Sequence, residues 1–171
     1  MDVDSPPKRW PGWVGFACRL ILGGALLAAG AMKVFDPEQS VRAVLAYEFP
    51  LPPTVTTVVG YGLPVVEIVL GLMILGGVLT RWTAAVGGLA MVVYIAAIMS
   101  AWARGLSIDC GCFTPGGVLL DVSQKTAYVQ DIVRDLGLLV CAVWLVARPV
   151  TRWSLDGWLN APVVKESHGQ V

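Results

Sequence analysis

The fold is decided by residues 57–79, TVVGYGLPVVEIVLGLMILGGVL, in which Glu67 is the single charged side chain. A helix rises 1.5 Å per residue, so this stretch would be about 35 Å long. That length is enough to cross the hydrocarbon core of a bilayer, about 30 Å thick. We therefore predict that residues 57–79 form a transmembrane helix.

Three further segments complete the predicted membrane domain. Residues 13–32 are mostly apolar, and residues 82–103 follow the span at 57–79 after a very short turn at Thr80-Arg81. The last span, 126–147, is polar in its first half, which must face protein or water and not lipid. We predict an all-α, four-transmembrane-helix bundle over residues 13–149, in which the short turn makes its two helices antiparallel neighbours.

The segments around these spans have their own character. Residues 1–12 are polar and proline-rich and read as a mobile N-terminal arm, and residues 150–171 form a C-terminal tail. After the first span, Asp36 suits a helix N-cap and Pro37 the first helical position. We predict a short amphipathic helix there, lying at the membrane interface. Its apolar face would comprise Val41, Val44 and Leu45.

Composition supports a membrane protein. Of the 171 residues, 56% are hydrophobic and 14% are charged, and the mean hydropathy is +0.71. Soluble domains carry about 25% charged residues, so we expect the lipid bilayer to solvate much of the chain. The net charge is zero, which gives no indication of a nucleic-acid partner. The single histidine, His168, lies in the polar tail, which disfavours an imidazole-rich metal site.

Basic residues indicate the orientation. Four spans put both termini on one side, which holds seven Lys and Arg residues against five on the other side. The positive-inside rule then favours cytoplasmic termini. We predict a multi-pass protein of the cell (cytoplasmic) membrane whose loop after residue 104 is extracytoplasmic, where disulfides persist.

That loop contains the sharpest local feature, Cys110-Gly111-Cys112. Two thiols one residue apart can close only a small, strained disulfide ring, which is easily reduced and suits exchange. A structural or inert cysteine pair is an alternative, and so is a soft-metal site for copper or zinc. Two thiolates without a histidine make a poor closed metal site within one chain, so we favour redox exchange.

Glu67 is the main candidate inside the membrane. A carboxylate near the middle of a span is costly unless it is paired or protonated, and it marks a functional candidate. The alternative is a structural ion pair, for which Arg19 and Arg134 lie at a suitable depth.

Arg134 and Asp135 begin the membrane-buried part of the last span, and Asp131 is placed at i, i+3 to pair with Arg134. Because this end of the helix is on the side of the cysteine loop, Arg134 is a candidate for stabilising a thiolate. The alternative is a helix end that snorkels to the interface. Lys33 and Arg104 are expected to be interface anchors, with a supporting role as the alternative.

Cys18 and Cys141 have similar depth, so the two side chains can touch. Buried lone cysteines usually behave as small hydrophobic residues. We favour that interpretation over a functional pair.

Several residues recur in an order that matches a known family. They are Arg19, Gly23, Gly30, Lys33, Leu63-Pro64, Glu67, Gly71, Arg81, Cys110-Gly111-Cys112-Phe113 and Arg134-Asp135. This pattern resembles the MauE branch of the DoxX-like integral membrane proteins over about residues 13–148. The chain has Tyr128 where that pattern leads us to expect a tryptophan.

The resemblance implies a four-helix membrane protein with a redox role. MauE-like members are associated with methylamine utilisation, through the maturation of a dehydrogenase subunit with many disulfides, beside a thioredoxin-like partner. Our leading hypothesis is therefore thiol–disulfide exchange by Cys110 and Cys112, as a possible oxidoreductase. Arg134 would favour the thiolate, Asp135 would orient Arg134, and Glu67 would move a proton or contact a quinone-like acceptor. The alternatives are a non-enzymatic accessory or assembly subunit of a membrane redox complex, and copper or zinc handling.

Overall fold

The computed structural model describes residues 10–50, 52–106, 108–109, 117–118 and 124–148. Within them the chain forms five helices: α1 (Trp10–Val34), α2 (Pro37–Ala46), α3 (Pro53–Gly76), α4 (Thr80–Ala103) and α5 (Gln124–Ala147). Two short strands, β1 (Ile108–Asp109) and β2 (Gly117–Val118), form an antiparallel ladder. The predicted all-α class is thus confirmed apart from this small ladder. The arm before residue 10, the tail after residue 148 and the Cys110–Cys112 pair lie outside the described residues.

Three helices are long and apolar enough to cross a membrane. They cover Gly12–Val34, Pro53–Gly76 and Thr80–Ala103. The chain is therefore a multi-pass membrane protein. Helix α5 has 24 residues, as long as α3 and α4, but Asp131, Arg134 and Asp135 lower its hydropathy. A fourth crossing by α5 stays a prediction.

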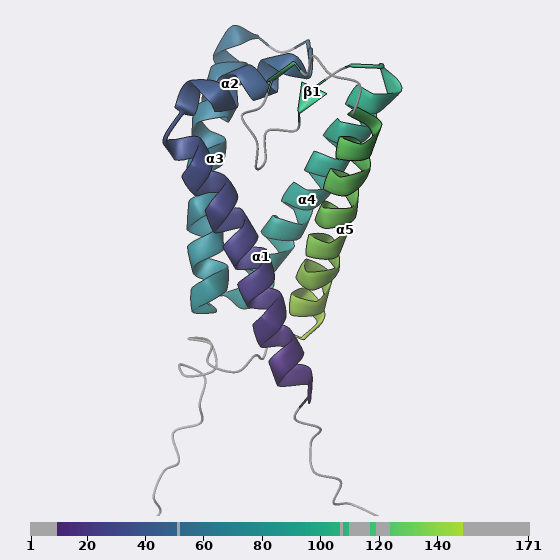
Figure 1. Cartoon of the computed structure of the whole chain (residues 1–171). Coiled ribbons are helices and arrows are strands. Elements are labelled where there is room, and N and C mark those ends of the chain that lie inside the picture. The colour runs from purple at the N-terminus through teal and green to yellow at the C-terminus, as the bar shows by residue number, and fades with distance from the viewer. Residues whose placement is uncertain (1–9, 51, 107, 110–116, 119–123, 149–171) are drawn as a thin grey trace, which may run out of the picture.

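The helices associate as two pairs that lean toward each other (Figure 1). Helix α1 packs chiefly on α3 and α4 chiefly on α5, and α1 crosses toward α5 to join the pairs. Helices α3 and α4 are antiparallel and in contact, as predicted, but they diverge after their turn and share far fewer contacts than the α1–α3 and α4–α5 pairs. The turn itself is Gly77–Leu79 and not Thr80-Arg81, since Gly77 adopts a left-handed conformation (φ 67°) that ends α3 early.

Small residues explain why these particular helices pair. A side-chain carbon on Gly30 would lie 2.7 Å from the Pro64 carbonyl oxygen, so the α1 and α3 backbones are in direct contact there. Between α4 and α5, a side-chain carbon added to Gly88 would lie 3.1 Å from Ala142 Cβ. In lipid, where burial of apolar surface gives little driving force, such close approach supplies the packing energy.

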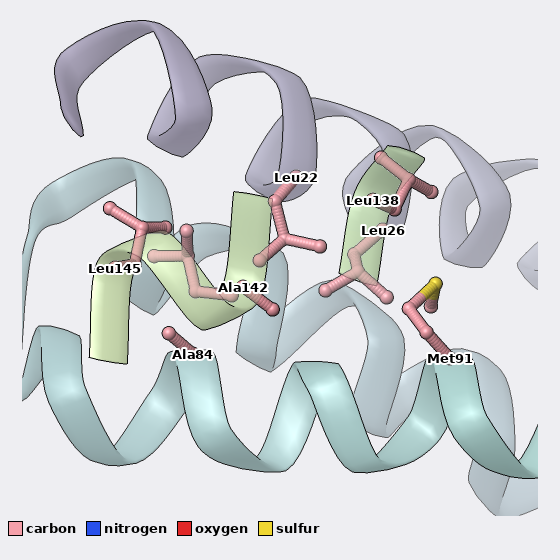
Figure 2. Packing of buried hydrophobic residues seen from close by; sticks show 8 residues of the cluster. Leu22, Leu26, Ala84, Met91, Leu138, Ala142 and Leu145 are labelled. Atoms are coloured by element: carbon pink, nitrogen blue, oxygen red, sulfur yellow. The ribbon is translucent and has the colours of Figure 1, made fainter. Parts of the chain in front are cut away.

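The two pairs share an apolar core at the end of the molecule that holds the α3–α4 turn (Figure 2). Leu22 and Leu26 of α1 pack there with Met91 of α4 and Leu138 of α5. A second, smaller cluster lies at the opposite end and includes Tyr47 and Tyr128 with Ile98 and Ala101 of α4. Between these apolar layers, polar side chains meet.

The short helix expected after the first span is present as α2. The Asp36 side chain accepts a hydrogen bond from the Gln39 N–H, and Pro37 occupies the first turn, as the sequence indicated. Helix α2 packs on α3, where Gly60 lets the Val41 backbone approach closely. The position of α2 at the membrane interface stays a prediction.

Candidate functional site: a buried polar cluster between the helix pairs

The centre of the polar cluster is an ion pair between α1 and α3. Lys33 Nζ lies 2.8 Å from Glu67 Oε1 and 2.9 Å from Oε2, so it binds both carboxylate oxygens. Lys33 is 5% exposed and Glu67 2% exposed. The close approach at Gly30, one turn before Lys33, brings the two side chains together. Two charges inside a membrane protein are costly unless they are paired with good geometry, and this bidentate pair provides that.

Helix α4 contributes Tyr94. Its hydroxyl donates a hydrogen bond of 2.6 Å to Glu67 Oε1. Its ring centroid also lies 5.8 Å from Lys33 Nζ, within range of a cation–π interaction. Glu67 therefore receives donors from two neighbouring helices, one from each helix pair.

Helix α5 supplies a second ionic group. Arg134 Nε donates to Asp135 Oδ1 at 2.9 Å, and Nη2 lies 2.9 Å from the same oxygen. Nη1 lies 2.9 Å from Asp131 Oδ1, which confirms the predicted i, i+3 pair. Asp135 is 2% exposed, so the polar first half of α5 turns this carboxylate toward protein, as expected. Glu67 and Asp135 line the same small cavity, which places the two ionic groups next to each other.

A small cavity lies where the two groups meet. Its volume is about 20 Å³, and Glu67, Tyr94, Arg134 and Asp135 supply its polar lining. One water molecule needs about 10–15 Å³ measured in this way, so the cavity has room for one. Asp135 Oδ2 is buried and has no hydrogen-bond partner among the described residues. The cluster therefore contains an acceptor oxygen without a partner on Asp135, a residue that lines a space in which a water molecule fits.

The cluster is unbalanced in charge. It comprises two cations, Lys33 and Arg134, and three carboxylates, those of Glu67, Asp131 and Asp135. With every group ionised it would carry one excess negative charge. Excess charge in an apolar interior is costly, and this cost falls mainly on Asp135, whose side chain is 2% exposed, whereas that of Asp131 is 19% exposed.

A structural ion pair was the alternative for Glu67, with Arg19 and Arg134 as the candidate partners, and the pair that forms is with Lys33. The buried Arg19 guanidinium instead donates to the carbonyl oxygens of Ile74, at 3.0 Å, and Leu75. These carbonyls end α3, where a helix lacks internal donors and attracts cations.

Sequence reasoning gave too little weight to Lys33 and did not single out Tyr94. Lys33 looked like an interface anchor because it ends an apolar run, although its place in the family pattern was a signal. Tyr94 gave no signal, because its contact depends on how α4 is rotated. Arg104 is exposed and joins the end of α4 to the segment after α2. Its guanidinium donates a 2.7 Å hydrogen bond to the Tyr47 carbonyl and lies 5.3 Å from the centroid of the Phe49 ring.

Cys110 and Cys112 lie outside the described residues, but the chain on either side of them is described. Strands β1 and β2 pair Asp109 with Gly117 and so close the segment that carries both cysteines. Strand β2 contacts α2. Just before β1, the Leu106 carbonyl accepts a 2.6 Å hydrogen bond from Tyr128, one turn from Asp131 on α5. The loop is thus anchored at the α2 end of the molecule, where α5 begins (Figure 1).

The other two cysteines lie on α1 and α5. Cys18 and Cys141 are free and half-buried. They pack against the apolar core at the end away from the hairpin. Their surroundings fit the interpretation as small hydrophobic residues.

No curated protein and no solved structure matches the chain. A family model does: the one described as methylamine utilisation protein MauE matches residues 11–148. This range covers all five helices except Trp10, and it includes the Lys33–Glu67 pair, the hairpin and the Arg134–Asp135 pair. The resemblance seen in the sequence is confirmed, and the chain belongs to the MauE family.

Proposed function

We propose that the chain is a thiol–disulfide exchange protein of the cell membrane, acting beside a thioredoxin-like partner in the maturation of a disulfide-containing protein. Cys110 and Cys112 are its reacting groups. The family's printed description points to methylamine utilisation as the setting. The observation that carries the proposal is the buried polar cluster on the helices below the hairpin that closes the cysteine loop. Ionisable groups inside a membrane bundle are energetically costly, and they therefore mark a functional site by default.

The proposed reaction is a two-electron exchange. A thiolate of the Cys110–Cys112 pair attacks a disulfide of the partner and forms a mixed disulfide, releasing one partner thiolate. The remaining cysteine then attacks the mixed disulfide and releases the second partner thiolate. The pair has lost two electrons and two protons, and the partner has gained them. The reverse sequence reduces the pair and oxidises the partner, and the relative reduction potentials set the direction.

In this proposal the polar cluster stabilises the thiolate through Arg134 and binds a proton near Glu67. Asp135 orients the Arg134 guanidinium through the 2.9 Å contacts described above. Asp131 and Asp135 already offset the charge of Arg134, so its effect on a thiolate is smaller than that of an unpaired arginine. Glu67 contributes to a site that can hold a proton. A cavity of about 20 Å³ accepts a water molecule and not a quinone ring, so we assign Glu67 to protons and not to quinone binding.

The proposal includes four crossings, with cytoplasmic termini and an extracytoplasmic cysteine loop. The charged first half of α5 would normally oppose a fourth crossing. That objection is weakened because Asp135 is buried against protein and Arg134 is paired with two carboxylates. The pairing of Arg134 with both Asp131 and Asp135 therefore supports α5 as the fourth span.

Thiol trapping on intact cells tests the proposal. A membrane-impermeant maleimide is applied to full-length protein with and without mild reductant, and labels are counted by mass. We expect two added labels after mild reduction, on Cys110 and Cys112. Cys18→Ser/Cys141→Ser serves as the matched control and should give the same gain, whereas Cys110→Ser/Cys112→Ser should abolish it.

Other results assign the protein to another class. A Cys110–Cys112 bridge that resists mild reductant would indicate a structural pair and an accessory or assembly subunit. Two free thiols that become protected from alkylation when copper(I) or zinc is added would indicate metal handling. Either result refutes exchange.

A further inference from the structure

A groove runs along the outer surface where α4 meets α5. Its volume is about 530 Å³, and its walls are mainly small or apolar side chains. Ala85, Gly88 and Val92 line it on α4, and Ala142 and Val146 line it on α5. It is separate from the small cavity at the polar cluster, and nothing in the proposed exchange reaction uses it.

A cationic group lies at one end of this apolar groove. Arg81 is part of the groove lining and is exposed. Within the described residues it forms no salt bridge, whereas Arg42 of α2 and Arg134 of α5 are paired with carboxylates. Arg148 follows directly after Ala147, which lines the same groove, and it too is exposed. The groove therefore combines an apolar channel with positive charge at one end.

The length of the groove matches one leaflet of a membrane. From Arg81 to Val92 the α4 axis rises about 16 Å, roughly half of the ~30 Å hydrocarbon core. Trp82, next to Arg81, is 71% exposed, as is typical of a tryptophan at headgroup depth. This places the Arg81 end of the groove at the membrane surface and the Val92 end near the bilayer midplane.

We propose that the α4–α5 groove is a binding site for an anionic phospholipid of the surrounding bilayer. One acyl chain lies along the groove, and the phosphate binds Arg81, with Arg148 adding to the attraction. A guanidinium pairs with phosphate through parallel hydrogen bonds, and a headgroup without its own cation leaves the full negative charge for this contact. The site goes beyond thiol exchange and does not depend on it.

Native mass spectrometry of the full-length protein tests this site. Protein in detergent is mixed with equal amounts of phosphatidylglycerol and phosphatidylcholine, and the retained lipid adducts are compared. We expect retention of phosphatidylglycerol over phosphatidylcholine in the wild type. Because both cationic groups at the headgroup end are removed, Arg81→Gln/Arg148→Gln should reduce this preference by roughly tenfold or more.

Further variants separate the groove from general lipid binding. Ala85→Phe fills the groove from an exposed position and should reduce retention of both lipids. Ala96 is an exposed position on α4 outside the groove, so Ala96→Phe should leave the retention of both lipids unchanged. Arg42→Gln removes a charge on α2 and should leave the preference for phosphatidylglycerol unchanged.

Three results would overturn the assignment. They are equal retention of the two lipids by the wild type, an unchanged preference in Arg81→Gln/Arg148→Gln, and a lipid-free dimer that Ala85→Phe dissociates. The last result would mean that a second copy of the chain occupies the groove. Each variant is first checked for monodisperse elution, so that loss of folding is not mistaken for loss of lipid.

Discussion

Replacing Lys33 with methionine should destabilise the protein more than any surface charge change, because it leaves Glu67 buried without its cation. Glu67 is 2% exposed, and Lys33 binds both of its carboxylate oxygens. After Lys33→Met, the hydrogen bond from Tyr94 would remain. Breaking a buried ion pair by removing one partner costs about 3–5 kcal/mol. We expect Lys33→Met to lower the free energy of unfolding by about that amount.

A double variant shows whether the loss comes from the unpaired charge. In Lys33→Met/Glu67→Gln the glutamine amide oxygen can still accept a hydrogen bond from the Tyr94 hydroxyl, and the charge of Glu67 is removed together with that of Lys33. Neutral replacement of a buried pair is often nearly neutral for stability. The double variant should therefore be more stable than either single variant. Unfolding is followed by tryptophan fluorescence as sodium dodecyl sulfate is added to protein in mild micelles.

Arg42→Met is the matched control. Its pairs with Asp36 and Glu38 are more than half exposed at the arginine, and such pairs contribute about 0–1 kcal/mol. A loss in Lys33→Met no larger than the loss in Arg42→Met would refute the argument. So would a double variant whose loss equals the sum of the two single losses, because the groups would then act independently.

Two further predictions follow from the packing of α1 on α3, and both use the same unfolding assay. Gly30→Ala should destabilise by about 1–3 kcal/mol, since its new carbon would lie 2.7 Å from the Pro64 carbonyl oxygen. Gly24→Ala, where no such atom lies within 4 Å, is the control and should be neutral or stabilising. Arg19→Leu should lower the free energy of unfolding by about 2–4 kcal/mol, because it removes charge-assisted hydrogen bonds to the carbonyls that end α3. A fully stable Gly30→Ala or Arg19→Leu would contradict the α1–α3 contact.

Local sequence was sufficient for the helices and for some of their ends. Apolar runs of span length predict helices because lipid leaves the backbone no partner except itself. Asp36 and Pro37 located the start of α2, since a cap acts through atoms within one turn. The end of α3 was placed too late, because the left-handed turn at Gly77 was not recognised within an apolar run.

The chemistry of individual residues was also partly readable. The cost of a charge in lipid required that Asp135 face protein, and the structure buries it. The spacing of Asp131 and Arg134 predicted their ion pair. The roles of Cys110 and Cys112 rest on the sequence pattern and on the family, and they stay predictions.

By itself, then, the sequence determined which segments are helical and which charges must be hidden, because both depend on local composition and on the solvent around each segment. Tertiary structure alone decided the partners. Glu67 pairs with Lys33 and Tyr94 while Arg19 binds the end of α3, a choice among side chains of similar depth. That choice depends on how each helix is rotated about its axis. The rotation is set by close contacts such as Gly30 against Pro64, between residues far apart in the chain, and helical periodicity alone does not encode them.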